Sequence, residues 1–213
     1  MTELVDSIVS SIIETPTLSE ARHDCLEMAL TPLSPIASEA VTMVTLLTGV
    51  KTAAVVSYSG AVAALSIAHG MPGGGVVTLV NPQPELVEHA RQRYGEEKPA
   101  GVLLRPITGL PLDVMSRLAD GAYDLVFVED VADQLGLFVE TSARLLRSGG
   151  ILLLPNSLAG GRFLESMDPA EATNADDDAA VAAATLADML AETEDFDAFR
   201  IPLDAGMTVA RRK

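Results

Sequence analysis

The hydrophobic positions of the chain follow two different periods and switch between them at regular intervals. Short apolar runs rich in valine, leucine and isoleucine lie at residues 52–56, 76–80, 101–107, 123–129 and 151–154. Stretches with apolar residues at helical spacing separate these runs, at residues 61–69, 85–94, 112–120 and 134–147. Strands that alternate with helices in this way predict βαβ units on a parallel sheet. Because the apolar runs lack polar alternation, we expect helices to cover both faces of that sheet.

Both ends of the chain depart from this alternation. Helical patterns alone precede the first strand, at residues 3–13, 18–30 and 34–48. At the other end, a loop at 160–178 and an alanine-rich helix at 179–191 lead to strand candidates at 198–202 and 207–211. The connection between these two strands is so short that they must pair antiparallel. The predicted fold class is therefore α/β, a doubly wound mixed sheet whose last strand is antiparallel, with helices at the N-terminus.

Composition restricts the partners of the protein more than its fold. The 213 residues include 30 Asp and Glu against 14 Lys and Arg, a formal net charge of −16. This balance argues against nucleic acid and anionic membranes as partners, because both attract basic side chains. The single cysteine, Cys25, excludes an intrachain disulfide. The N-terminal residues carry acids where a secretory signal has Lys or Arg, and we therefore expect a cytoplasmic protein.

Four segments resemble one known family. They are Ser34-Pro35, YDLVFVE at 123–129, ARLLRSGGILLL at 143–154 and IPLDAGMTVARR at 201–212. With the order of elements, they are similar to the small bacterial O-methyltransferases related to catechol O-methyltransferase. The resemblance implies a seven-stranded Rossmann-like class I methyltransferase domain at 49–213, after a helical cap and dimerisation segment at 1–48. It also implies S-adenosylmethionine as cofactor, a small-molecule acceptor and a homodimer.

In this family the cofactor lies at the carboxyl ends of the strands, over a Gly-rich turn and two or three acids. The matching positions here are mostly neutral. The implied cofactor-binding residues are Ser57, Tyr58, Ser59, Gly60, Asn81, Gly109 and Glu129. Family acids are replaced at Val55, Asn81 and Leu110. The alternative interpretation is structural: residues 57–61 form a tight strand-to-helix turn, and Asn81 is a turn residue before Pro82.

The family's metal site is also incomplete in this sequence. Catechol-type enzymes hold Mg²⁺ with an acid after the fourth strand and an Asp-Asn pair after the fifth, oxygen ligands that suit this cation. Glu129 matches the first acid, but the pair reads Pro155-Asn156, and Ala132 takes the place of the family's lysine base. Glu129 and Asn156 are therefore only weak metal candidates. Glu129 is the candidate catalytic residue, as an acid on the cofactor or substrate side near the reacting centre; the alternative is an ordinary solvated strand end. We expect the catechol-type metal mechanism to be absent.

Two functions of different classes follow from these residues. The first is O-methylation of a small acceptor, which depends largely on positioning and can proceed without the metal when the acceptor is already nucleophilic. The alternative is a catalytically silent relative that serves as a binding or dimerisation module, suggested by the joint loss of acids and glycines at one site. A nicotinamide-dependent oxidoreductase is disfavoured, because the Gly-x-Gly-x-x-Gly turn is absent.

Overall fold

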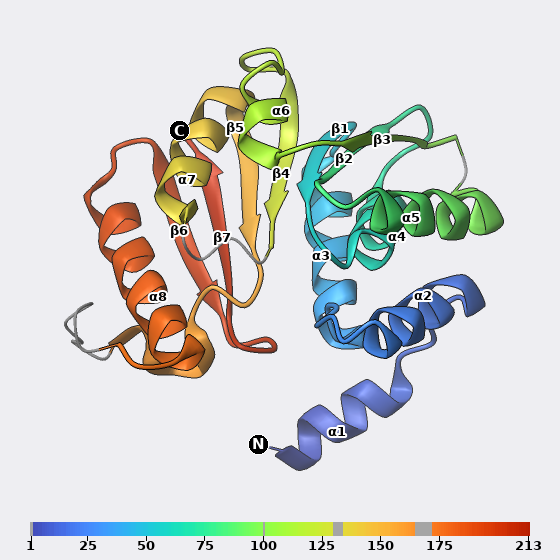
Figure 1. Cartoon of the computed structure of the whole chain (residues 1–213), viewed down its shortest axis with the longest axis horizontal. Helices are drawn as coiled ribbons and strands as arrows, with labels where there is room; N and C mark the ends of the chain where they lie inside the picture. Colours follow the sequence, from blue (N-terminus) through green and yellow to red (C-terminus); the bar gives the residue numbers. More distant parts are fainter. Residues whose placement is uncertain (1, 100, 130–133, 165–171) are drawn as a thin grey trace. The chain divides into compact units, whose positions relative to one another are not determined.

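The computed structural model of the protein describes residues 2–99, 101–129, 134–164 and 172–213 (Figure 1). The chain divides into two compact units, Met1–Gly109 and Leu110–Lys213. Within the described ranges, none of the helices has the length and apolar character that crossing a bilayer would require. The predicted boundary at residue 48 falls inside the first unit, and the division at that point stays a prediction.

The first unit contains three parallel strands and five helices. Its elements are α1 (Thr2–Ser11), α2 (Pro16–Glu27), α3 (Pro35–Thr48), β1 (Thr52–Val56), α4 (Gly60–Gly70), β2 (Val76–Asn81), α5 (Pro84–Glu97) and β3 (Leu103–Thr108). Strand β2 pairs in parallel with β1 on one side and with β3 on the other. Helix α4 packs on β1 and β2, and α5 packs on β2 and β3. This arrangement confirms the predicted βαβ units.

Local sequence signals explain where the N-terminal helices begin. The side chains of Thr15 and Ser34 accept hydrogen bonds from the main chain of the first turns of α2 and α3. In both helices a proline follows the cap, where its missing N–H is no loss. Helix α3 ends at Gly49, whose φ of 64° lies in the left-handed region that glycine adopts without strain. The predicted helix at residues 34–48 therefore has the right bounds within one residue.

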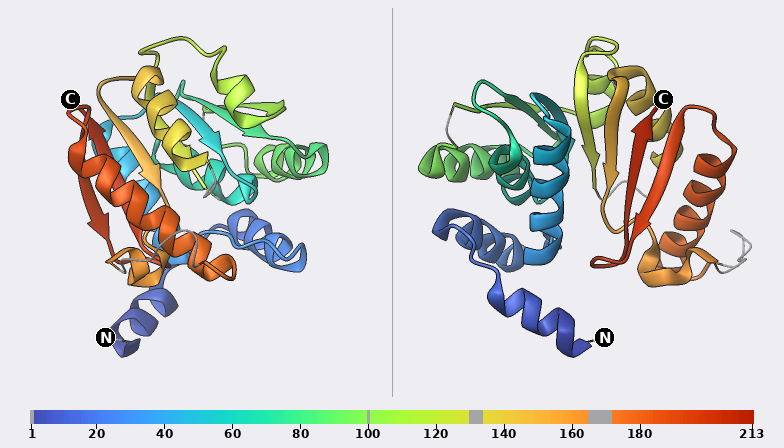
Figure 2. Two further views of the ribbon diagram at one scale, coloured as in Figure 1. Left: turned by 60° about the vertical axis from the view of Figure 1, so that its left-hand side comes forward. Right: turned by 180° about the vertical axis from the view of Figure 1, so that it is seen from behind.

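The second unit combines two parallel strands with an antiparallel hairpin. Its elements are α6 (Pro111–Met115), β4 (Tyr123–Val128), α7 (Leu135–Leu145), β5 (Leu146–Leu154), η2 (Ala159–Leu164), α8 (Ala175–Glu192), β6 (Phe196–Ile201) and β7 (Met207–Arg212). Strands β4 and β5 pair in parallel, and β7 pairs antiparallel with both β5 and β6. Helix α8 lies along the β6–β7 hairpin in both views of Figure 2. The strand order is β3-β2-β1 within the first unit and β4-β5-β7-β6 within the second, and the parallel strands with an antiparallel ending confirm the predicted mixed sheet.

Several predicted elements have other bounds in the structure. Helix α8 begins at Ala175, inside the loop expected at 160–178, and the short helix η2 also overlaps that range. The helix expected at 134–147 ends at Leu145, and β5 begins at Leu146 instead of residue 151. Pairing with β4 shifts between Tyr123 and Leu125, and Gly149 within the irregular part has a φ of 77°. A bulge of this kind inserts extra residues into one strand, which period counting in the sequence does not detect. The helix expected at 112–120 is also shorter and ends at Met115.

Candidate active site

The turn between β1 and α4 is built from small, buried polar residues. Ser57 and Ser59 are both buried, and their hydroxyl oxygens lie 3.2 Å apart. Tyr58 between them is half-buried. The carbonyl of Ser59 accepts hydrogen bonds from Val62 and Ala63 and thereby starts helix α4. This turn therefore presents two hydroxyl groups and the first N–H groups of a helix at the carboxyl end of β1.

Asn81, the last residue of β2, connects this turn to the ends of both neighbouring strands. Its Nδ2 atom donates a hydrogen bond of 2.8 Å to the carbonyl of Ser57. Its Oδ1 atom accepts one of 2.8 Å from the main-chain N–H of Gln83, and its carbonyl accepts one of 3.1 Å from the N–H of Gly109. The structure thus brings together Ser57, Asn81 and Gly109, three of the predicted cofactor-binding residues. The predicted structural role of Asn81 as a turn residue is present as well, in its bond to Gln83.

The amide of Asn81 retains part of its hydrogen-bonding capacity. An asparagine side chain has two donor hydrogens and two acceptor lone pairs. The bonds to Ser57 and Gln83 use one of each. One donor and one acceptor are left, which match the donors and acceptors of a ribose diol. Only 2% of the surface of Asn81 is exposed, so its amide lies below the surface at this edge of the sheet.

Gly60 is explained by packing inside the first unit. A Cβ atom at this position would lie 2.9 Å from both terminal carbons of Leu79, a fully buried residue of β2. Such a distance is shorter than a van der Waals contact, so any side chain at residue 60 would displace Leu79. The glycine therefore allows α4 to approach the strand closely. Sequence reasoning identified Gly60 through the family turn, but it contained no signal for this contact.

The remaining predicted site residues belong to the second unit. Glu129 directly follows β4 and is buried, with 1% of its surface exposed. Asn156 lies two residues after β5 and has a φ of 55°. Its Oδ1 atom accepts a hydrogen bond of 3.2 Å from the N–H of Ala205, in the loop between β6 and β7. Because Phe127 pairs with Leu153, Glu129 and Asn156 follow neighbouring strands at the same sheet edge.

This edge does not form a complete metal site. One lone pair of the Asn156 oxygen is already used by the hairpin loop. In the part of the chain that the structure describes, no three His, Cys, Asp or Glu side chains are grouped so that they could hold a metal ion. Residue 132, where the family's lysine base would lie, is outside the described residues. The donor set among the described residues thus does not fit a catechol-type magnesium centre.

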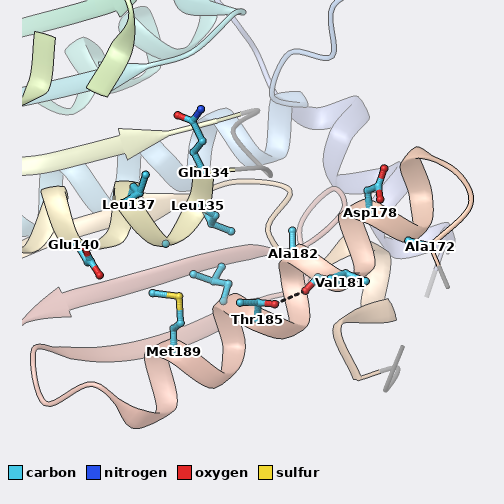
Figure 3. A pocket seen from close by; sticks show the side chains of 12 residues that line it. Gln134, Leu135, Leu137, Glu140, Ala172, Asp178, Val181, Ala182, Thr185 and Met189 are labelled. Carbon is cyan, nitrogen blue, oxygen red and sulfur yellow. Dashed lines mark hydrogen bonds between the residues drawn. The ribbon is translucent and has the colours of Figure 1, made fainter. Parts of the chain in front are cut away.

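Helices α7 and α8 of the second unit enclose a pocket that the sequence did not indicate. Its volume is about 880 Å³, within the range of small-molecule sites. Figure 3 shows side chains of α7 and of α8 facing each other across this space. The α8 residues on its wall include Asp178, Val181, Ala182 and Met189. The sequence contains only a weak signal for this pocket, the single glycine Gly136 within the apolar face of α7. In the structure Gly136 lies opposite Met189.

The sequence is similar to proteins of one known family over nearly its whole length. The sequence matches the family model for O-methyltransferases over residues 9–213. A Mycobacterium avium protein named "Putative O-methyltransferase" is 33% identical over 210 residues, which cover 98% of this chain and 91% of that protein. A Mycobacterium tuberculosis protein of the same name is 32% identical over 203 residues, 95% of this chain and 87% of that protein.

Solved structures share the fold of this chain. A Corynebacterium glutamicum protein has a TM-score of 0.84 and 27% identity, and the match covers 99% of this chain and 96% of that chain. An O-methyltransferase from Bacillus cereus, solved in complex with SAH, has a TM-score of 0.83 and covers 99% of this chain and 97% of its own. Its identity of 18% supports the fold alone. Together, the family match over residues 9–213 and the relatives above 30% identity show that the chain belongs to the O-methyltransferase family.

Proposed function

We propose that this protein transfers a methyl group from S-adenosylmethionine to a hydroxyl group of a small-molecule acceptor. One observation carries the proposal: the side chain and main chain of Asn81 join the turns after β1, β2 and β3 into one edge lined by small residues. In open α/β sheets, ligands bind at this carboxyl edge of the strands. Family membership supports the reaction type, and the Streptomyces achromogenes O-methyltransferase TomG, solved with SAM, supports the choice of cofactor.

Each predicted residue has a distinct part in this proposal. The segment Ser57–Tyr58–Ser59–Gly60 lines the methionine half of the cofactor with hydroxyl and main-chain groups. The spare donor and acceptor of Asn81 bind the ribose diol, and the main chain at Gly109 flanks the adenine. Because a neutral amide replaces the family's carboxylate, the ribose loses a charge-assisted bond, which is roughly twice as strong as a neutral one.

Glu129 is the proposed catalytic residue. When bound, S-adenosylmethionine supplies an electrophilic methyl group on a positively charged sulfur. The carboxylate of Glu129, buried at the end of β4, accepts a hydrogen bond from the acceptor hydroxyl and orients it. We propose that no divalent metal takes part, since Pro155 stands in place of one family ligand and Asn156 already binds the hairpin loop.

Calorimetric titration with S-adenosylmethionine and with its demethylated product tests this function. We expect saturable binding of both and weaker binding to the Asn81→Ala variant. Gln83→Ala is the matched control, because Gln83 is exposed and only its main-chain N–H contacts Asn81. Absence of binding of either compound at millimolar concentration would refute the proposal. With a panel of phenols as acceptors, Glu129→Gln should retain cofactor binding and lose most of the methyl transfer.

We also propose that the protein is a cytoplasmic homodimer that pairs through residues 1–48, with 49–213 as the cofactor-binding domain. Apolar side chains on α1 and α3 support this, because Leu4, Leu46 and Leu47 are each more than 60% exposed. A monomer rarely leaves several large apolar side chains together in solvent. Light scattering should give twice the mass of one chain, and Leu47→Glu should shift the protein to monomer. Leu103→Glu is the control, because Leu103 on β3 is also more than 60% exposed.

A further inference from the structure

The pocket between α7 and α8 has an apolar interior. Leu135 on α7 and Val181, Ala182 and Met189 on α8 face it (Figure 3). Leu186 also lines the pocket and is buried. The space exists partly because α7 has a glycine here. A Cβ at Gly136 would already touch the sulfur and the terminal carbon of Met189 at 3.4 Å. Any longer side chain at residue 136 would occupy the pocket.

The ionisable groups on the wall of this pocket are all acidic. Glu140 on α7 and Asp178 on α8 line it, and the residues along its wall include no lysine, arginine or histidine. Neither carboxylate forms an ion pair within the ranges that the structure describes. The neighbouring Asp177 differs, because Arg162 donates a hydrogen bond of 3.0 Å to it. That bond and those from Thr173 lower the pKa of Asp177. The charge of Asp177 is thus balanced by the protein, whereas those of Asp178 and Glu140 are not.

We propose that this pocket binds a small amphiphilic organic cation, with an alkyl or aryl part and an ammonium group. The apolar part packs against Leu135, Val181 and Met189, and burial of that surface supplies most of the affinity. The ammonium group lies at the opening, near Glu140 or Asp178, where the two carboxylates favour a positive charge and disfavour a negative one. The site lies within the second unit and does not depend on the proposed methyl transfer.

Three probes with the same hydrocarbon and different charge test the site: hexylammonium, hexan-1-ol and hexanoate, each titrated by NMR or calorimetry. We expect hexylammonium to bind best, hexan-1-ol more weakly and hexanoate least, with only the affinity for the cation falling as salt is added. Methylammonium controls for general attraction to an acidic protein and should not bind measurably. Equal affinity for the three hexyl probes would overturn the proposal.

Variants distinguish this pocket from the rest of the acidic surface. Glu140→Gln and Asp178→Asn should each weaken hexylammonium binding by about two- to fivefold, as for an exposed ion pair, and leave hexan-1-ol binding unchanged. Asp176→Asn is the matched control, because Asp176 is an exposed residue of the same first turn of α8 that does not line the pocket. An equal effect of Asp176→Asn would contradict the proposal.

Ala182→Leu should weaken binding of every hexyl probe, because the larger side chain takes up part of the apolar wall of the pocket, and both residues suit a helix. Its thermal unfolding should match that of the unmodified protein, which would show that the variant is folded. Titration of the same variant with S-adenosylmethionine distinguishes the pocket from the proposed methyl transfer. Its affinity for the cofactor should be unchanged. Unchanged affinity for all three hexyl probes in a folded Ala182→Leu protein would refute the site.

Discussion

The side-chain amide of Asn81 donates a hydrogen bond of 2.8 Å to the main-chain carbonyl of Ser57. The two residues end neighbouring strands and lie 24 positions apart in the chain. The bond depends on an N–H donor at a position where the family has a carboxylate, which has no donor to offer at neutral pH. The asparagine therefore changes how this edge is held together.

Asn81→Asp should destabilise the protein, although it restores the family residue. The carboxylate would face the Ser57 carbonyl without a donor and leave a buried polar group unsatisfied, at a cost of about 1–3 kcal/mol. Urea unfolding measures the difference. Gln83→Glu is the control. It replaces an amide by a carboxylate at an exposed neighbouring residue and should change the free energy of unfolding little. An Asn81→Asp protein of unchanged stability would contradict the role of this hydrogen bond in holding the edge together.

Gly60→Ala should destabilise the protein by about 1–3 kcal/mol, because the new methyl group collides with Leu79. Leu79→Val removes the colliding carbons and should relieve this effect. In the Leu79→Val background, Gly60→Ala should be neutral or stabilising, since alanine favours a helix more than glycine does. A double-mutant cycle measures this coupling. Additive effects of the two substitutions would contradict the contact.

Asp24 on α2 should make stability depend on acid pH. Burial raises the pKa of Asp24, but hydrogen bonds from His89 and Arg93 on α5 outweigh it, and the pKa is lowered below 3.8. The stabilisation is therefore present above pH 3.8 and is lost as the pH falls through the lowered value. Asp24→Asn should cost about 1 kcal/mol at neutral pH.

Urea unfolding at several pH values tests this linkage. The stability difference between the unmodified protein and Asp24→Asn should shrink as the pH falls below 3.8. Asp6→Asn is a control in the neighbouring helix α1, where Asp6 is exposed. A difference that stays constant down to acid pH would contradict the role of Asp24.

Tyr94 should govern stability at alkaline pH. Burial raises the pKa of its phenol from 10.0 to about 12, and the hydroxyl donates to the carbonyl of Val102 at 3.3 Å. The group thus stabilises the fold fully below pH 10, and this contribution is lost as the pH rises toward 12. Tyr94→Phe should therefore unfold at a higher alkaline pH than the unmodified protein. Absorbance of tyrosinate during a pH titration should lose one late step in this variant.

Metal removal should leave the proposed methyl transfer unchanged. The edge that carries Glu129 and Asn156 lacks the third ligand of the family's metal centre, so neither EDTA nor added Mg²⁺ should alter the rate. Measuring the release of the demethylated cofactor with and without each reagent tests this. A large stimulation by Mg²⁺ would show instead that Glu129 and Asn156 act as ligands.

Much of the fold followed from the pattern of apolar residues, but its irregular parts did not. The bounds of β1 were predicted correctly, and those of β2 to within one residue, because a buried parallel strand appears in sequence as an unbroken apolar run. The predicted start of β5 was wrong, because the irregular segment around Gly149, where the pairing with β4 shifts, produces no regular spacing of apolar residues in the sequence. The site was predicted through the resemblance, which identified Ser57, Asn81 and Gly109 without indicating that hydrogen bonds connect them.

The sequence by itself determined the order of the elements, the parallel core and the antiparallel ending, because periodicity and loop length are local properties. Only the tertiary structure decided what individual residues contact. The bond from Asn81 to Ser57, the contact of Gly60 with Leu79 and the pocket beside Gly136 each join segments that are distant in the chain. Such contacts depend on how helices and strands pack, and no local pattern of residues encodes that packing.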